Sequence, residues 1–228
     1  AKTIDYNKTG GHSLAKLLMQ RDELMVRRAM ADVLTRLFRR LGEDALPFYQ
    51  QLKSDNDPDI LAAISTTSSD LKYLDTELWA ENMVELSKHE LPVVRRNLVP
   101  SLRDYFETFP DDKRKLLPVL WQDGDEVVRT RMRELLIKMS DISSLQFSSR
   151  ITDLTQHGCD LTPLWQLMDA RNQRSSQPWK DWLSGIGEMP VVDQKAIHVS
   201  TMEAPESLPN LVEACLLYTS PSPRDGLL

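Results

Sequence analysis

Apolar residues in the segment 116–139 fall into two groups with helical spacing, separated by a polar interruption. The first group contains Leu116, Leu117, Val119 and Leu120. The second group has the i, i+4, i+7, i+8, i+11 spacing of one helix face and contains Val128, Met132, Leu135, Leu136 and Met139. The aspartates of the intervening segment 122–125 favour turns and helix N-caps. This pattern predicts two helices joined by a short turn.

The same pattern recurs along the chain with a constant step of 34 residues. Four apolar columns keep this step: Leu18, Leu52, Leu86 and Leu120; Val26, Ile60, Val94 and Val128; Met30, Ile64, Leu98 and Met132; Leu37, Leu71, Tyr105 and Met139. A fifth column, the arginine column, contains Arg27, Leu61, Arg95 and Arg129. Helices of about 12 residues are marginal alone in water, so such pairs must pack on neighbouring pairs. The repetition predicts an all-α fold, an α-solenoid of stacked antiparallel helix pairs with four repeats over residues 12–140.

Two repeat classes of similar length can be tested by their motifs. The 34-residue period is that of tetratricopeptide repeats, but their motif has only one partial counterpart, over residues 38–45, and it does not recur one or two periods later. The ankyrin T-P-L-H motif has one partial counterpart at 162–165. An N-cap at Thr162 followed by Pro163 in the first turn of a helix explains that segment better. Neither class is favoured.

A different motif does recur, at the start of three of the four second helices. An acidic or proline-containing turn is followed by Val-Arg in the segments 23–27, 91–95 and 125–129. This pattern resembles the HEAT repeat, whose second helix typically opens with Asp-x-x-Val-Arg and whose first helix often contains a proline, as at Pro47 and Pro118. The resemblance covers residues 12–140. The chain departs from the class in its period, which is shorter than the usual ~40–47 residues, and in Leu61, which replaces the arginine.

The resemblance to HEAT repeats implies a non-catalytic scaffold that binds other proteins. HEAT arrays serve as scaffold and regulatory subunits of type-2A serine/threonine phosphatases, as nuclear transport receptors and as vesicle-coat adaptors. The phosphatase scaffold group is the nearest, because the segments 92–96 and 123–129 are similar to its turns and second helices. The expected partner is then a phosphatase catalytic subunit. The alternatives are a nuclear-transport or coat-adaptor protein and, from a different class, a HEAT-like nucleic-acid-binding or repair protein.

The arginine column has two interpretations. In the structural one, each arginine reaches turn carboxylates of its own or the adjacent repeat and fixes one repeat on the next, so that Leu61 marks a weaker junction. In the functional one, the arginines form a basic ridge that binds an acidic peptide or a phosphate. The ridge would contain Arg27, Arg28, Arg95, Arg96, Arg129, Arg131 and Arg133.

Residues 141–189 are expected to form a degenerate helical repeat or cap, with helices over 144–157 and 162–172 and a third from 177. Trp165, Trp179 and Trp182 would cover the apolar face of the last repeat, or Trp179 and Trp182 would anchor a partner. Because partners of HEAT scaffolds dock on the turns within repeats, the resemblance adds turn residues to the candidates. The candidate protein-interaction residues are Asp57, Pro92, Arg96, Trp121, Asp123, Arg131, Trp179 and Trp182.

The two ends of the chain differ from the repeats. Residues 1–11 form an N-terminal flank without an initiator Met or the apolar core of a signal peptide, and we interpret them as a fragment edge. Residues 190–214 are interrupted by prolines. The segment 215–225 resembles the translated read-through of a sequencing-library adapter, so residues 215–228 are treated as a non-native tail. We expect the natural chain to continue beyond Ala214.

Composition narrows the functional classes further. With 28 Lys and Arg against 34 Asp and Glu, the formal net charge of −6 opposes a general nucleic-acid binder. No apolar run reaches the ~18 residues of a membrane span. Two cysteines among 228 residues favour a reducing, cytoplasmic location, with the nucleus as the alternative.

Candidate chemistry is sparse in this sequence. The four histidines have no metal-ligand spacing, and the glycines at 185 and 187 are not followed by a helix start as a dinucleotide loop requires. The sequence therefore predicts no catalytic residue, no cofactor and no metal site, and we expect the protein not to be an enzyme.

Overall fold

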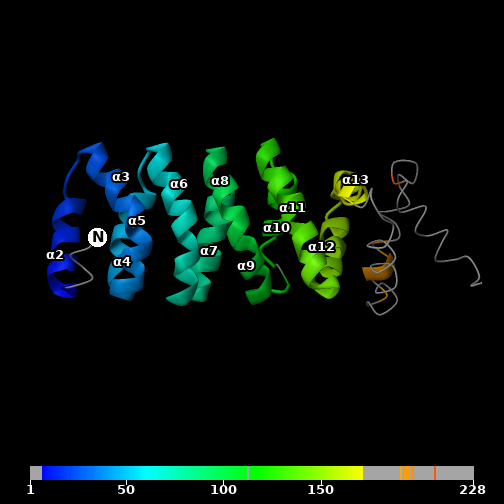
Figure 1. Cartoon of the computed structure of the whole chain (residues 1–228), viewed down its shortest axis with the longest axis horizontal. Coiled ribbons are helices and arrows are strands. Elements are labelled where there is room, and N and C mark those ends of the chain that lie inside the picture. The colour runs from blue at the N-terminus through cyan, green and yellow to red at the C-terminus, as the bar shows by residue number, and fades with distance from the viewer. Residues whose placement is uncertain are drawn as a thin grey trace, which may run out of the picture. The chain divides into compact units, whose positions relative to one another are not determined.

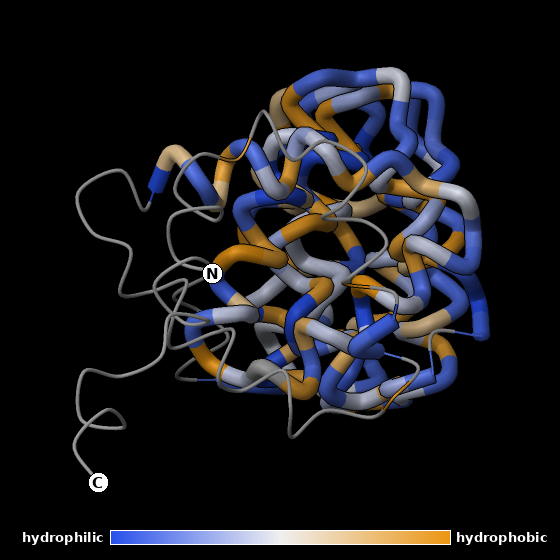
Figure 2. Tube along the Cα trace, turned by 90° about the vertical axis from the view of Figure 1, so that its right-hand side faces the viewer, coloured by the Kyte–Doolittle hydropathy of each residue, from blue (hydrophilic) through white to orange (hydrophobic). Residues whose placement is uncertain are grey.

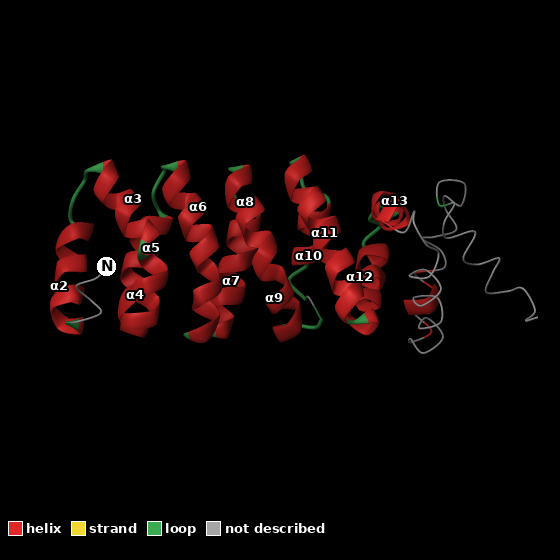
Figure 3. Cartoon of the chain, in the orientation of Figure 1, coloured by secondary structure: helices red, strands yellow, loops and turns green. Residues whose placement is uncertain are grey.

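A computed structural model describes residues 7–111, 113–171, 191, 193–195, 197 and 208 of the chain. These residues form helices and connecting turns without any β-strand (Figure 3). The predicted all-α class is therefore confirmed. The chain divides into two compact units, unit 1 (Ala1–Leu116) and unit 2 (Leu117–Leu228), which are described separately. The helix expected from 177, most of the segment 190–214 and the tail 215–228 lie outside the described residues.

Unit 1 contains three helical hairpins within its described part (Figure 1). The first has α2 (Lys8–Met19) followed by α3 (Leu24–Asp32) and α4 (Leu34–Leu41), and the 3-10 turn η1 (Gly42–Ala45) leads out of it. The second has α5 (Leu46–Lys53), α6 (Pro58–Thr67) and the 3-10 segment η2 (Ser68–Tyr73). The third has α7 (Thr76–Ser87), α8 (Pro92–Leu98), the 3-10 turn η3 (Val99–Ser101) and α9 (Leu102–Thr108).

Each second helix of unit 1 changes its geometry partway along. The first is interrupted at Val33, between α3 and α4. The second tightens into η2 after Thr67. In the third, Pro100 lies within η3, where a proline has no backbone N–H to donate to a helical hydrogen bond. The sequence predicts one second helix for each hairpin, and the structure shows these second helices divided into shorter segments.

Unit 2 begins within α10 (Leu116–Trp121) and continues with α11 (Glu126–Ile142), α12 (Ser144–Gln156) and α13 (Thr162–Arg171). Helix α11 packs against both α12 and α13. The helices expected over 144–157 and 162–172 agree with α12 and α13 to within a residue. In the core of this unit, Phe147 and Trp165 meet edge to face with ring centroids 6.2 Å apart.

The apolar columns form the cores of both units. Figure 2 shows apolar and hydrophilic positions alternating along the helices, as an amphipathic pattern requires. The column residues of the second and third hairpins of unit 1 are at most 2% exposed: Leu52, Leu86, Ile60, Val94, Ile64, Leu98, Leu71 and Tyr105. Those of unit 2, Leu120, Val128, Met132 and Met139, are equally buried. The predicted equivalence of positions 34 residues apart is therefore confirmed as a burial pattern.

The first hairpin is the exception to this burial. Met30 and Leu37 are 3% exposed, whereas Leu18 and Val26 of the same hairpin are only half-buried. In the second and third hairpins of unit 1 the face that corresponds to Leu18 and Val26 is buried, and the second helices α6 and α8 each pack against the second helix of the hairpin before. No helix precedes α2 among the described residues, so this face keeps its solvent contact.

Neighbouring hairpins of unit 1 are joined on both sides. Their second helices lie in a row, with α6 packed between α3 and α8. Their first helices are linked by polar contacts. The side chain of Gln51 donates to the carbonyl of Met19 over 2.9 Å, and the amide of Asn82 donates to the buried hydroxyl of Tyr49 over 2.6 Å. Within unit 1, each second helix is therefore in contact with the second helix of the neighbouring hairpin.

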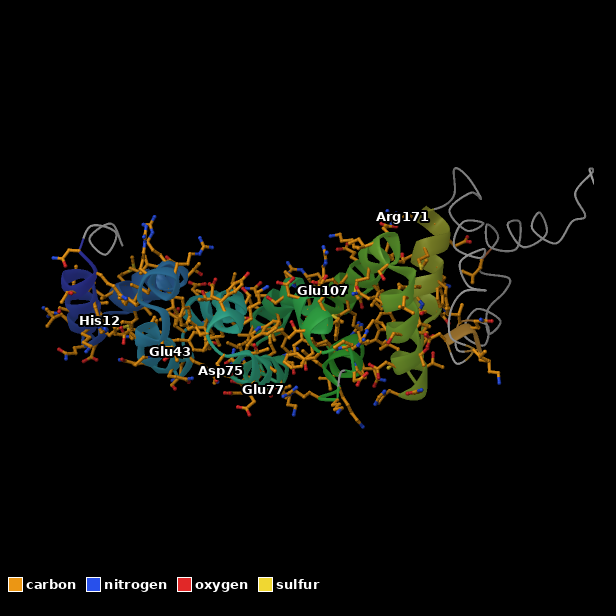
Figure 4. All side chains as sticks on the ribbon, turned by 90° about the horizontal axis from the view of Figure 1, so that it is seen from below. His12, Glu43, Asp75, Glu77, Glu107 and Arg171 are labelled. Atoms are coloured by element: carbon orange, nitrogen blue, oxygen red, sulfur yellow. The ribbon has the colours of Figure 1, made fainter. Side chains whose placement is uncertain are left out.

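The connections leading from one hairpin to the next carry acidic side chains. Figure 4 labels Glu43 in η1, Asp75 and Glu77 at the start of α7, and Glu107 near the end of α9. The carboxylate of Asp75 caps α7 by accepting from the backbone N–H groups of Glu77 and Leu78, at 2.9 and 3.0 Å. Glu77 itself forms an ion pair with Arg114. Capping and helix-dipole effects thus explain two of these acidic residues.

Candidate protein-interaction surface

The turn between the two helices of a hairpin has a recurring geometry. The residue two positions before the N-cap accepts a hydrogen bond from the N-cap backbone N–H through its side chain, as in an Asx turn. The acceptors are Asp55, His89 and Asp123, and the distances to the backbone nitrogens of Asp57, Leu91 and Asp125 are 3.0, 3.1 and 2.8 Å. These acceptors are again 34 residues apart. This column is hard to recognise in the sequence, because an imidazole replaces one of the carboxylates.

The second helices then begin as the sequence predicts. The carboxylate of Asp57 accepts from the backbone N–H of Ile60 at 3.2 Å, and that of Asp125 accepts from Val128 at 3.1 Å. Pro58 and Pro92 occupy the first turn of their helices, where the missing N–H costs nothing. Asp57 is therefore primarily an N-cap, and Pro92 is a helix-start residue.

The arginine column fixes the turns through backbone carbonyls. Arg95 donates to the carbonyl of His89, and Arg129 donates to that of Asp123, each over 2.5 Å. Arg27 donates to the carbonyl of Asp22 in the same way. The structural interpretation expected carboxylates as the acceptors. Backbone oxygens of the arginine's own turn are instead the acceptors that all three arginines share.

Arg27 and Arg28 also reach the second hairpin. Arg27 Nε lies 2.7 Å from the carboxylate of Asp55. Arg28 binds Asp57 through two nitrogens, at 3.0 and 2.7 Å, and lies 2.9 Å from Asp59. The hydrogen bonds from Arg28 hold the pKa of Asp57 below its ordinary value and raise the pKa of Arg28. Such two-point pairs fix geometry as well as charge.

We expect this network to make the second hairpin sensitive to acid. Burial alone would raise the pKa of Asp55, but hydrogen bonds from the Asp57 backbone N–H and from Arg27 leave it below the ordinary 3.8, and that of Asp57 is lowered too. A lowered folded-state pKa contributes stability that is present above pH 3.8 and is lost as the pH falls through the folded-state value. We expect the protection of the segment 55–64 from hydrogen exchange to decrease when the pH is lowered below about 4.

The matched variant for this acid effect is D57N. Asparagine can still cap α6 and accept from Arg28, but it does not titrate, so the loss of protection below pH 4 should be smaller and the protection at neutral pH lower. A wild-type chain with equal protection of this segment at pH 3 and pH 7 would contradict the role of the network.

The sequence-predicted interaction residues lie in both units. In unit 1, Asp57 starts α6 and Pro92 starts α8, the helix packed against it, and Arg96 lies a turn further along α8. In unit 2, Trp121 is 6% exposed and its indole N–H donates to the carbonyl of Asp160 over 3.0 Å, while Asp123 is 7% exposed. Arg131 is exposed on α11. Trp179 and Trp182 lie outside the described residues.

The arginines that would form the basic ridge already make contacts within the chain. The five arginines Arg27, Arg28, Arg95, Arg129 and Arg133 donate to turn carbonyls or to carboxylates. Arg96 and Arg131 take part in interactions of their own. A ligand for the ridge would have to compete with these contacts, which favours the structural interpretation of the arginine column.

A hollow in the surface of unit 1 lies elsewhere, at the far ends of the second helices. Its volume is about 480 Å³, and it is lined by Arg39 of α4, Ser69, Asp70, Lys72 and Tyr73 of η2, and Asp104 of α9. None of these residues is a sequence-predicted candidate. A signal was present, because Arg39 and Tyr73, like Asp70 and Asp104, are 34 residues apart and form polar columns in the register of the apolar ones.

Lys72 contacts two other residues that line this hollow. Its ammonium group forms an ion pair with Asp104 and lies 4.9 Å from the centre of the Tyr73 ring. The hydrogen bond to Asp104 raises the pKa of Lys72, so the lysine keeps its charge at neutral pH. The Tyr73 side chain is 76% exposed.

In the part of the chain that the structure describes, no three His, Cys, Asp or Glu side chains are grouped as metal ligands would be. Within these residues, every helix is too short or too polar to cross a membrane.

The observed features define an all-helical protein whose hairpins share one sequence register. Comparison of the chain with protein-family models, with curated proteins and with solved structures finds no match. The candidate surface is therefore defined by its own geometry, in the row of second helices and the hollow at their ends.

Proposed function

We propose that the chain is a HEAT-like α-solenoid of stacked antiparallel helix pairs that acts as a non-catalytic protein-interaction scaffold. The observation that carries the proposal is the common register of the buried and polar columns. Positions 34 residues apart are buried in successive hairpins, and the polar positions between them recur on the row of second helices in unit 1. Repeated hairpins of this kind create extended surfaces for partners.

The partner implied by the HEAT resemblance is the catalytic subunit of a type-2A phosphatase. Such a complex suits a cytoplasmic scaffold with the nucleus as the alternative, and the buried, unpaired Cys159 is compatible with either reducing compartment. The two arginines Arg96 and Arg131 are the ridge residues to test first, because they are also among the interaction residues that the sequence predicts.

The scaffold function can be tested with the full chain immobilised through a tag. Purified phosphatase catalytic subunit and a cell extract are passed over wild type and over the double variant R96A/R131A. If the ridge binds the partner, the variant should lose most of the retained protein while its melting temperature stays unchanged. Retention that is unaffected, together with a lowered melting temperature, would assign both arginines a purely structural role.

The same experiment tests the scaffold itself. Wild type should retain at least one protein with micromolar or better affinity, confirmed with the purified partner by calorimetry. A chain that folds but retains no protein, even after chemical crosslinking, would contradict the proposed function.

A further inference from the structure

The hollow at the ends of the second helices of unit 1 has an unusual charge balance. Its lining contains two cations, Arg39 and Lys72, and two anions, Asp70 and Asp104. Lys72 and Asp104 neutralise each other in an ion pair. Arg39 and Asp70 have no hydrogen-bonding or ionic side-chain partner in the described part of the chain. The hollow therefore presents one unpaired guanidinium and one unpaired carboxylate.

Tyr73 is held in a defined position beside these charges. Lys72 lies above one face of its ring, and Asp104 anchors Lys72 in turn. The rest of the ring is open, since the residue is 76% exposed. Tyrosine and arginine are among the residue types that contribute most to protein–protein binding, and tyrosine loses little side-chain entropy when it is covered. Arg39 and Tyr73 are thus both available to contact a bound partner.

The charge balance restricts the ligand. A small anion such as phosphate would meet Arg39 but would be repelled by the carboxylate of Asp70, and the same repulsion acts on a nucleic-acid backbone. An extended peptide can satisfy both signs of charge. Its acidic side chain can pair with Arg39, and its backbone N–H groups can donate to Asp70. An apolar or aromatic side chain of the same peptide can cover Tyr73.

We propose that this hollow binds a short extended segment of a partner protein, with an acidic side chain paired to Arg39 and an apolar or aromatic side chain packed on Tyr73. The proposal rests on the proposed scaffold function and assigns it a surface away from the sequence-predicted turns. It makes the hollow a specificity site, because a partner without the acidic residue would leave Arg39 unpaired.

The test begins with short random peptides displayed on phage and selected on the immobilised full chain. The peptide enriched most strongly is synthesised with a fluorescent label, and its affinity is measured by fluorescence anisotropy. Enriched peptides should share an acidic residue close to an apolar or aromatic one. R39A and Y73A should each weaken binding by at least about tenfold.

A mutant cycle identifies the contact with Arg39. Replacing the acidic residue of the peptide by its amide should weaken binding to wild type, and this effect should disappear in R39A. The controls are R21A, which removes an exposed arginine from the other end of the first hairpin, and M25A, which removes a side chain that is 75% exposed. Both controls should bind the peptide as wild type does, and melting curves of all variants should coincide.

Three results would overturn the proposal. They are a selection that enriches no peptide, peptides without an acidic residue, and affinities unchanged by R39A and Y73A. If peptides or proteins bind the chain but ignore these two variants, the hollow is wrongly assigned and the scaffold function stands. If no protein partner is retained either, the scaffold function fails as well.

Discussion

Replacing Leu86 by aspartate is expected to abolish the cooperative unfolding of unit 1. Leu86 is 2% exposed in α7 and belongs to the first apolar column, so the variant places a carboxylate inside the packed hairpins. Burying an unpaired charge, together with the lost leucine contacts, costs more than about 4 kcal/mol, which is a large share of the stability of a small domain. The measurement is urea unfolding followed by circular dichroism, with hydrogen exchange to assign the change to residues 7–111.

Leu17→Asp is the matched control for Leu86→Asp. Leu17 lies on α2 and is 61% exposed, so its aspartate variant should unfold within about 0.5 kcal/mol of wild type. An unchanged transition in L86D, or equal losses in both variants, would contradict the buried register.

Trp165→Ala is expected to destabilise unit 2 by about 3 to 5 kcal/mol. Trp165 is 1% exposed on α13 and packs edge to face against Phe147 of α12, so truncation leaves a cavity between these helices. Hydrogen exchange should show faster exchange in α12 and α13, and urea unfolding should give the free-energy change. Circular dichroism is the better optical probe here, since the chain has five tryptophans.

Leu145→Ala serves as the comparison for Trp165→Ala. Leu145 lies on α12 and is 59% exposed, so removing its side chain should change stability by less than about 1 kcal/mol. A W165A variant as stable as L145A would show that the observed contact with Phe147 does not support unit 2.

The cores of the two units could be predicted from the sequence because burial follows periodicity. Ile64, Leu98 and Met132 differ in shape, but each is fully buried, so the step between them mattered more than residue identity. The divisions of the second helices were harder to predict. Pro100 is a helix breaker that can be recognised in the sequence, whereas the identity of Val33 does not predict the interruption between α3 and α4.

Contacts between distant residues account for what the sequence did not reveal. Trp121 follows an apolar stripe and looked available to a partner, but its indole bonds to the backbone of Asp160, 39 residues away. The hollow depends on the spatial meeting of Arg39 and Asp104, which no local pattern encodes. Periodic analysis of polar positions would have grouped Arg39 with Tyr73, but it could not have shown that Arg39 is unpaired.

Leu61 has a consequence for how neighbouring hairpins depend on one another. Leu61 is 3% exposed and occupies the position at which the other hairpins have an arginine that donates to a carbonyl of its own turn. The turn at residues 55–57 therefore lacks this hydrogen bond. Arg27 and Arg28 of the preceding hairpin instead form ion pairs with Asp55 and Asp57 of this turn. The second turn therefore depends on Arg27 and Arg28 of the first hairpin for its order. A mutation that destabilises the first hairpin should destabilise the second turn as well.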